Sequence, residues 1–154
     1  MFTFSSEVND WLLVGGDLDL SFDLTGRSYA ETVADLQSNG VTHVLDLRSE
    51  GSDQEAWGLP DGHYCHAPII DSRSHVPPEE WYVAVEKFVR RFWDEGFYGD
   101  RLYVHCQMGV NRGPSAAMLA LLTVEDDLDP WAAFHMIREA RPVAGLVYAE
   151  FVGM

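Results

Sequence analysis

A strand pattern, a short loop and a helix pattern follow one another between residues 101 and 122, and this stretch restricts the fold more than any other. The strand covers residues 101–104, and the helix begins near Pro114, whose fixed φ angle suits a first helical turn. Residues 116–122 are apolar on every side, so this helix is expected to be central and buried. The order predicts an α/β domain in which the loop follows the carboxyl end of a middle strand.

The loop carries a cysteine and an arginine, Cys106 and Arg112, six positions apart with Gly109 between them. Backbone amides at such a junction, together with the positive end of the helix dipole, form an anion site. A cysteine at a helix N-terminus beside a cation is acidic, so we expect Cys106 to be a thiolate at neutral pH. Arg112 offers a bidentate fork to a tetrahedral oxyanion. The loop therefore predicts a phosphate site with its own nucleophile.

The run from His105 to Arg112, which reads His-Cys, five residues, Arg, resembles the signature loop of the protein tyrosine phosphatases. The whole chain is most similar to the small dual-specificity branch of that superfamily. The resemblance implies that Cys106 forms a phosphocysteine and that His105 orients the loop and tunes the thiolate. Neither a metal nor another cofactor is expected, because loop amides and Arg112 supply the charge stabilisation. The phosphate-binding residues it implies are Gln107, Met108, Gly109, Val110, Asn111 and Arg112.

A leaving phenolate or alkoxide needs a proton that a thiolate cannot give, so a carboxylic acid must supply it. Asp71 is the best candidate, since it follows a predicted strand, precedes a predicted helix and stands 35 residues before Cys106 (106 − 71). The resembling family carries its general acid in this loop. After phosphoryl transfer the same carboxylate would act as the base on water. Lesser candidates are Asp46, Asp53 and Asp61.

Gly113 departs from the family pattern, which usually has Ser or Thr directly after the arginine. The resemblance implies that this hydroxyl helps to expel the thiolate, and Ser115 lies two positions too late to replace it. The sequence favours a metal-independent phosphomonoester hydrolase acting on phosphotyrosine, phosphoserine or phosphothreonine. A module that binds phosphate and turns it over slowly or not at all stays open. A rhodanese-like sulfurtransferase is less favoured, because Arg112 closes the loop and Asp71 is suitably placed.

Periodicity and turn signals predict the rest of a single domain over residues 1–154, with a core from about residue 8. The expected architecture is a central, mainly parallel, twisted sheet flanked by helices. Strands are predicted over 11–14, 41–47 and 64–70, and helices over 28–39, 79–95, 130–141 and, as a short last element, within 143–151. Loops are expected at 15–27 and 48–62, the latter with a helical turn at 54–57. Pro68 pushes its strand toward an edge of the sheet or toward its own end.

The formal charge of −15, from 25 acidic and 10 basic residues, disfavours nucleic acid and anionic membranes as partners. A phosphorylated protein or a small phosphomonoester must then be attracted locally, by Arg112, the loop amides and nearby arginines such as Arg48 or Arg73. Gln107 and Met108 leave the loop neutral, which argues mildly against an inositol lipid substrate. The sequence does not specify the oligomeric state.

Two cysteines, Cys65 and Cys106, form no disulfide framework. With no apolar run of about 18 residues and no signal-peptide pattern, we expect a soluble, cytoplasmic protein. A metal site at residues 63–66 is disfavoured, since residues 63 and 65 share one face of a strand while residue 66 points away. Cys65 is interpreted as a core cysteine, with protection of Cys106 as a disulfide during oxidation as the alternative.

Overall fold

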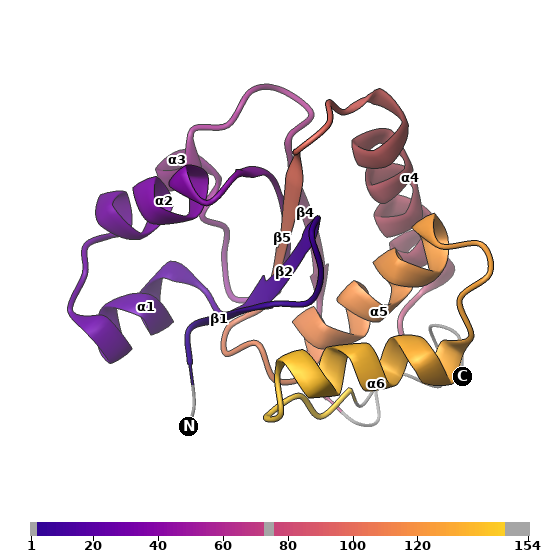
Figure 1. Ribbon diagram of the computed structural model, residues 1–154. Coiled ribbons are helices and arrows are strands. Elements are labelled where there is room, and N and C mark those ends of the chain that lie inside the picture. Colours follow the sequence, from indigo (N-terminus) through magenta and orange to yellow (C-terminus); the bar gives the residue numbers. More distant parts are fainter. Residues whose placement is uncertain (1–2, 73–75, 147–154) are drawn as a thin grey trace.

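A five-stranded sheet lies between two layers of helices in the computed structural model, which describes residues 3–72 and 76–146 (Figure 1). The strand order is β1-β2-β5-β3-β4. Strand β2 runs parallel to β5, β5 to β3 and β3 to β4, while β1 is antiparallel to β2. The predicted, mainly parallel sheet is therefore confirmed. The strands are β1 (Ser5–Glu7), β2 (Leu12–Gly15), β3 (Val41–Arg48), β4 (Tyr64–Ile69) and β5 (Arg101–His105).

Within the described residues, three helices cover each face of the sheet (Figure 1). One layer contains α1 (Leu18–Thr25), α2 (Tyr29–Ser38) and α3 (Gln54–Trp57). The other contains α4 (Glu79–Glu95), α5 (Arg112–Val124) and α6 (Pro130–Ala140). Successive side chains of a strand point to opposite faces of the sheet, so the core consists of two clusters. Leu102 and Val104 pack in the cluster that includes α4, α5 and α6, whereas Tyr103 packs in the cluster that includes α1, α2 and α3.

Local signals account for the helix ends that the sequence predicted. Ser28 and Glu31 form a complete capping box at the start of α2. At the start of α6, the Asp129 side chain accepts a hydrogen bond from the amide of Trp131 at 2.7 Å. Strand β4 is an edge strand, as Pro68 indicated.

Helix α1 corrects the expectation of a loop at residues 15–27. Its apolar residues alternate with polar ones, which is a strand-like period and hid the helix. The helix forms because the Asp17 side chain accepts from the Leu20 amide at 2.8 Å and because Gly26, with a φ of 74°, ends it. Phe22 remains 54% exposed, so the alternation does not correspond to a buried face.

Two further expectations concern the ends of the chain. Strand β1 precedes residue 8 and pairs with β2, and the sequence pattern did not indicate it. The short last helix was expected within 143–151; residues 143–146 are not helical, and the remainder lies outside the described residues. None of the helices in the described ranges is both long and apolar enough to cross a membrane.

Candidate active site

The loop between β5 and α5 follows the middle strand of the sheet, as predicted, and the side chains of Cys106 and Arg112 are buried. Cys106 is 3% exposed and Arg112 is 2% exposed. The thiol lies against the first turn of α5, because a Cβ atom on Gly113 would stand 3.3 Å from the Cys106 Sγ. Cys106 is therefore held at the positive end of a helix that is buried along most of its length.

The backbone of residues 107–110 turns its four carbonyl groups away from the loop. These carbonyls accept, in chain order, from the Asp17 amide at 3.1 Å, Arg141 Nη2 at 3.1 Å, Arg141 Nε at 2.7 Å and the Gly145 amide at 2.6 Å. In a trans peptide the next N–H points opposite to the carbonyl, so these amides turn inward. Among the described residues, no acceptor pairs with the amides of residues 108–110. Inward amides of this kind form an anion nest.

Gly109 is required by both its conformation and its surroundings. Its φ is 70°, in the left-handed region that favours glycine. A Cβ atom there would stand 2.6 Å from the carbonyl carbon of Gly15 and 2.8 Å from Arg141 Nη2. Backbone conformation and lack of space therefore both disfavour a side chain at position 109.

The guanidinium of Arg112 is held through its Nη1 atom, while its Nε atom has no hydrogen-bond partner among the described residues. Its Nη1 lies 2.9 Å from Oε1 of Glu50 and donates to the carbonyl of Ile69 at 3.1 Å. Its Nε is buried and has no hydrogen-bond partner among the described residues. Partial burial would raise the pKa of Glu50, but hydrogen bonds from Arg112 and Ser49 lower it overall. Glu50 is thus ionised at neutral pH and orients Arg112 without using its Nε.

Asp71 is exposed and lies at the edge of this loop. Its Oδ1 accepts a hydrogen bond from Asn111 Nδ2 at 3.0 Å, across 40 residues of sequence. Because Asn111 directly precedes Arg112, this bond joins the loop that carries Asp71 to the loop that carries Cys106. The structure thus brings Asp71 to residues 106–112, hereafter the signature loop.

Solved phosphatase structures are similar to this chain over nearly its whole length. The PTP-2 phosphatase of Cydia pomonella has a TM-score of 0.76 and 19% sequence identity, with 99% of this chain and 89% of that chain covered. Human DUSP28 has a TM-score of 0.69 and 20% identity, with coverages of 97% and 88%. PTPMT1 in complex with PI(5)P has a TM-score of 0.69 and 18% identity, with coverages of 97% and 94%.

The chain has the protein tyrosine phosphatase fold. No family model matches its sequence, and no curated protein matches it either. The likeness to this phosphatase fold is therefore carried by the three-dimensional structure and, within the sequence, by the signature loop.

Arg48 is buried in a network of ion pairs, with 5% of its surface exposed. Its guanidinium forms ion pairs with Asp17 at 3.0 Å, Asp46 at 3.2 Å and Asp53 at 3.0 Å. Although burial opposes its charge, these carboxylates raise the pKa of Arg48 overall. The expectation that Arg48 attracts phosphate is therefore wrong, because three carboxylates already neutralise it. Arg73, the other expected cation, lies outside the described residues.

The lesser candidates for the general acid have other environments. Asp46 is fully buried and accepts a hydrogen bond from the Tyr64 hydroxyl at 2.5 Å. Burial would raise the pKa of Asp46, but His105, Arg48 and Tyr64 together lower it. Asp53 accepts from the Leu18 amide at 3.3 Å, in addition to its ion pair. Asp61 is exposed in the turn before β4.

His105 is buried between the sheet and the signature loop, with 1% of its surface exposed. Its ring stacks on Tyr103 with 5.4 Å between centroids, and Nδ1 lies 3.2 Å from the carbonyl oxygen of Cys106. Nε2 lies 3.9 Å from Oδ2 of Asp46. These positions suit a residue that orients the loop from below.

Ser115 and Gly113 both lie in the first turns of α5. The Ser115 Oγ is fully buried and has no hydrogen-bond partner among the described residues. Gly113 leaves the space beside the Cys106 sulfur without a side chain. The residue directly after Arg112 therefore offers the thiol no hydroxyl.

Cys65 lies on β4, two strands away from the strand that precedes Cys106. It pairs with Leu45 on β3, and Leu45 pairs with Val104 on β5. With about 4.8 Å between strands and about 3.3 Å per residue, its Cα stands about 12 Å from that of Cys106, beyond the roughly 7 Å that a disulfide spans. Burial raises the pKa of Cys65 to about 11. This geometry favours a core cysteine over a redox partner.

The histidines near Cys65 make contacts of other kinds. His63 stacks on His43 with ring centroids 4.0 Å apart, and His66 Nε2 lies 2.6 Å from the carbonyl oxygen of Arg48. Within residues 3–72 and 76–146, no group of three or more His, Cys, Asp or Glu side chains could hold a metal ion.

Sequence reasoning missed two residues that hold the signature loop, Glu50 and Arg141. Glu50 lies just after the carboxyl end of β3. An acidic residue at that edge of the sheet was the sequence signal that could have identified it. Arg141 is buried, with 1% of its surface exposed, and donates to the carbonyls of Met108 and Gly109. Its neighbour Pro142 marks the end of α6, but nothing in the local pattern indicated what the arginine contacts.

Proposed function

We propose that the protein is a metal-independent phosphomonoester hydrolase that acts through a phosphocysteine on Cys106. The observation that carries this proposal is the anion nest of inward amides, closed by the buried Arg112 Nε, around the end of the helix that holds the thiol. Such a nest complements the equatorial oxygens of a phosphoryl group in transfer. The phosphatase fold supports the same chemistry and gives no support to a sulfurtransferase.

In the first step, the Cys106 sulfur attacks phosphorus, so that an S–P bond forms while the P–O bond to the leaving group breaks. Asp71 gives its proton to the departing oxygen, and Arg112 with the loop amides stabilises the charge on the phosphoryl oxygens. In the second step, Asp71 takes a proton from water, the water oxygen bonds to phosphorus, and the S–P bond breaks. Inorganic phosphate leaves and the thiolate is regenerated.

We infer that the substrate is a protein phosphorylated at tyrosine, at serine or threonine, or at both kinds of residue, or a small phosphomonoester. PTPMT1 is known in complex with PI(5)P, but the signature loop here carries no lysine beside Gln107 and Met108. The net charge of −15 also repels anionic membranes and nucleic acid. Because the nucleophile must stay a free thiol, the chemistry suits the reducing cytoplasm.

A phosphate-binding module with slow turnover is the second candidate, and Gly113 is the observation that favours it. In the resembling family a hydroxyl at this position helps to expel the thiolate. Without it, hydrolysis of the phosphocysteine would be slower than its formation, and the enzyme would accumulate in the phosphorylated state.

Turnover of p-nitrophenyl phosphate tests the proposal. Steady hydrolysis by the native chain, its loss in Cys106→Ser and its retention in the matched control Cys65→Ser are the expected results. A burst equal to the enzyme concentration followed by negligible turnover would support the binding module instead. Full activity in Cys106→Ser would refute both.

A further inference from the structure

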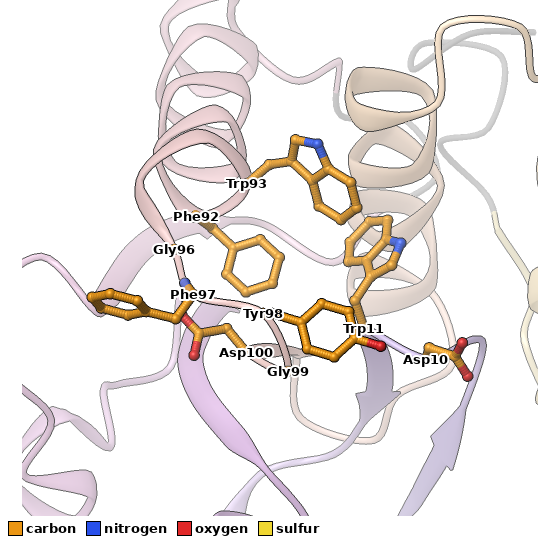
Figure 2. A pocket seen from close by; sticks show the side chains of 9 residues that line it. All are labelled: Asp10, Trp11, Phe92, Trp93, Gly96, Phe97, Tyr98, Gly99 and Asp100. Atoms are coloured by element: carbon orange, nitrogen blue, oxygen red, sulfur yellow. Dashed lines mark hydrogen bonds between the residues drawn. The ribbon is translucent and has the colours of Figure 1, made fainter.

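A cavity lies at the start of β5, which is the end of that strand opposite the signature loop. Figure 2 shows the side chains that line it. It has a volume of about 720 Å³ and is formed by the chain just before β2, the end of α4 and the turn between α4 and β5. Strand β5 has five residues, and at about 3.3 Å per residue it separates this cavity from Cys106 by roughly 20 Å. The cavity is therefore distinct from the proposed active site.

Four aromatic rings, from Trp11, Phe92, Trp93 and Tyr98, surround the cavity, whereas the ring of Phe97 points away from it (Figure 2). Trp11 and Phe92 are 8% and 4% exposed and form its floor, with ring centroids 5.9 Å apart. Trp93 meets Trp11 edge-on at 5.5 Å and is 48% exposed. Tyr98 is fully exposed. Exposed aromatic rings gathered beside a cavity are typical of a binding surface.

The charges at the cavity are negative. Asp10 and Asp100 line it, and Asp100 is fixed because its Oδ2 accepts a hydrogen bond from the Phe97 amide at 3.0 Å. The adjacent Arg101 does not supply a free positive charge, since its Nη1 pairs with Glu7 at 2.9 Å. Among the described lining residues there is no lysine, arginine or histidine. Aromatic faces beside carboxylates attract cations.

Charge and shape together identify the class of occupant. A second copy of this chain would bring another −15 charge to an acidic surface, which disfavours self-association here. The cavity is much larger than a single ammonium group needs, and it can also hold the aliphatic stem of a lysine or arginine and part of its flanking chain.

We propose that this cavity binds a basic peptide segment of a partner protein and inserts a lysine or arginine side chain between Trp93 and Tyr98. The stem packs on the rings, and the charged end lies toward Asp10 and Asp100. This docking does not depend on the proposed phosphatase chemistry, because the two sites share no residue. A phosphoprotein carrying such a segment would be held near the active site by two contacts, which raises its effective concentration there.

Binding of fluorescein-labelled short peptides tests the proposal. Four peptide pools differ only in a fixed central residue, which is arginine, lysine, norleucine or glutamate, with mixed flanking residues. We expect the arginine and lysine pools to bind at least about tenfold more tightly than the other two, with an affinity that falls as salt is added. Equal binding of the norleucine pool, or no binding of the basic pools, would overturn the proposal.

Variants localise the binding. Trp93→Ala and Asp10→Asn should each weaken binding of the basic pools by about tenfold, a change of about 1.4 kcal/mol. The matched controls are Trp131→Ala, an exposed tryptophan on α6, and Asp126→Asn, an exposed acid between α5 and α6. If the controls weaken binding as much as the test variants, the basic peptides bind only through the general charge of the chain and the proposal is wrong. Hydrolysis of p-nitrophenyl phosphate should be unchanged in all four.

Discussion

Arg141 holds the signature loop from outside, and its replacement by methionine should damage both stability and catalysis. The guanidinium donates to the carbonyls of Gly109 at 2.7 Å and Met108 at 3.1 Å on one side. On the other side it donates to the carbonyl of Thr3 at 2.8 Å and to Ser6 Oγ at 3.0 Å. Methionine keeps the apolar stem but removes every donor.

The size of the effect follows from the two loop carbonyls that lose their partner. A polar group left buried and unsatisfied costs about 1–3 kcal/mol, so the loss of partners at two carbonyls in Arg141→Met should lower the free energy of unfolding by about 2–6 kcal/mol. The amides on the far side of the same peptides then lose their fixed orientation. If about 1.4–2.8 kcal/mol of transition-state stabilisation is lost, kcat/KM falls by about 10–100-fold.

Urea denaturation and p-nitrophenyl phosphate kinetics measure the two effects of Arg141→Met. Arg138→Met is the matched control, because Arg138 is exposed on α6, the helix that Arg141 directly follows, and its replacement should change neither quantity. Ser6→Ala removes only an outer partner and should cost no more than about 1 kcal/mol, with kinetics unchanged. Native kinetics in a folded Arg141→Met variant would refute the inference that this residue orients the loop.

Three further predictions concern turnover, the acid and stability. If Gly113 slows breakdown of the phosphocysteine, Gly113→Ser should raise the steady rate after the burst and Gly113→Ala, which adds the same Cβ without a hydroxyl, should not; equal rates would exclude a role for the hydroxyl. Asn111→Ala should lower kcat for alkyl phosphates more than for p-nitrophenyl phosphate, because the side-chain amide of Asn111 holds Asp71. An equal loss of kcat for both kinds of substrate would contradict this. Burial, followed by the charge of His63, lowers the pKa of His43 to about 4 from 6.5. Between pH 4 and pH 6.5, His43 therefore binds a proton in the unfolded chain but not in the folded chain. The free energy of unfolding should fall by about 3 kcal/mol as the pH drops from about 6.5 to about 4. In urea titrations across that range His43→Gln should reduce the fall, and an identical pH dependence would show that another group causes it.

Short-range signals in the sequence predicted much of the fold and the position of the signature loop. The strand that ends at His105, the apolar helix α5 and the spacing of Cys106 and Arg112 all lie within a single stretch of chain. Gly109 could be predicted as well, because a tight loop at such a junction requires a left-handed residue. These features depend on local conformation, which sequence patterns encode directly.

The roles of the residues that sequence reasoning missed depend on contacts between segments that are far apart in the sequence. Glu50 contacts Arg112 across 62 residues, and Arg141 contacts Thr3 across 138. Arg48 was assigned to the substrate because its charge was visible, whereas the three carboxylates that neutralise it come together only in the folded chain. A charged residue in a sequence indicates a potential partner of opposite charge, and the fold determines which group the side chain contacts.

Detection of the phosphorylated enzyme tests the proposed phosphocysteine chemistry most directly. The native chain would be mixed with p-nitrophenyl phosphate, denatured rapidly and digested, and its peptides analysed by mass spectrometry. We expect one phosphoryl group on the peptide that contains Cys106, at a level that matches the burst of product, and none on that peptide from Cys106→Ser. A phosphoryl group on another residue, or steady hydrolysis with no phosphorylated enzyme at any time, would contradict the proposed function.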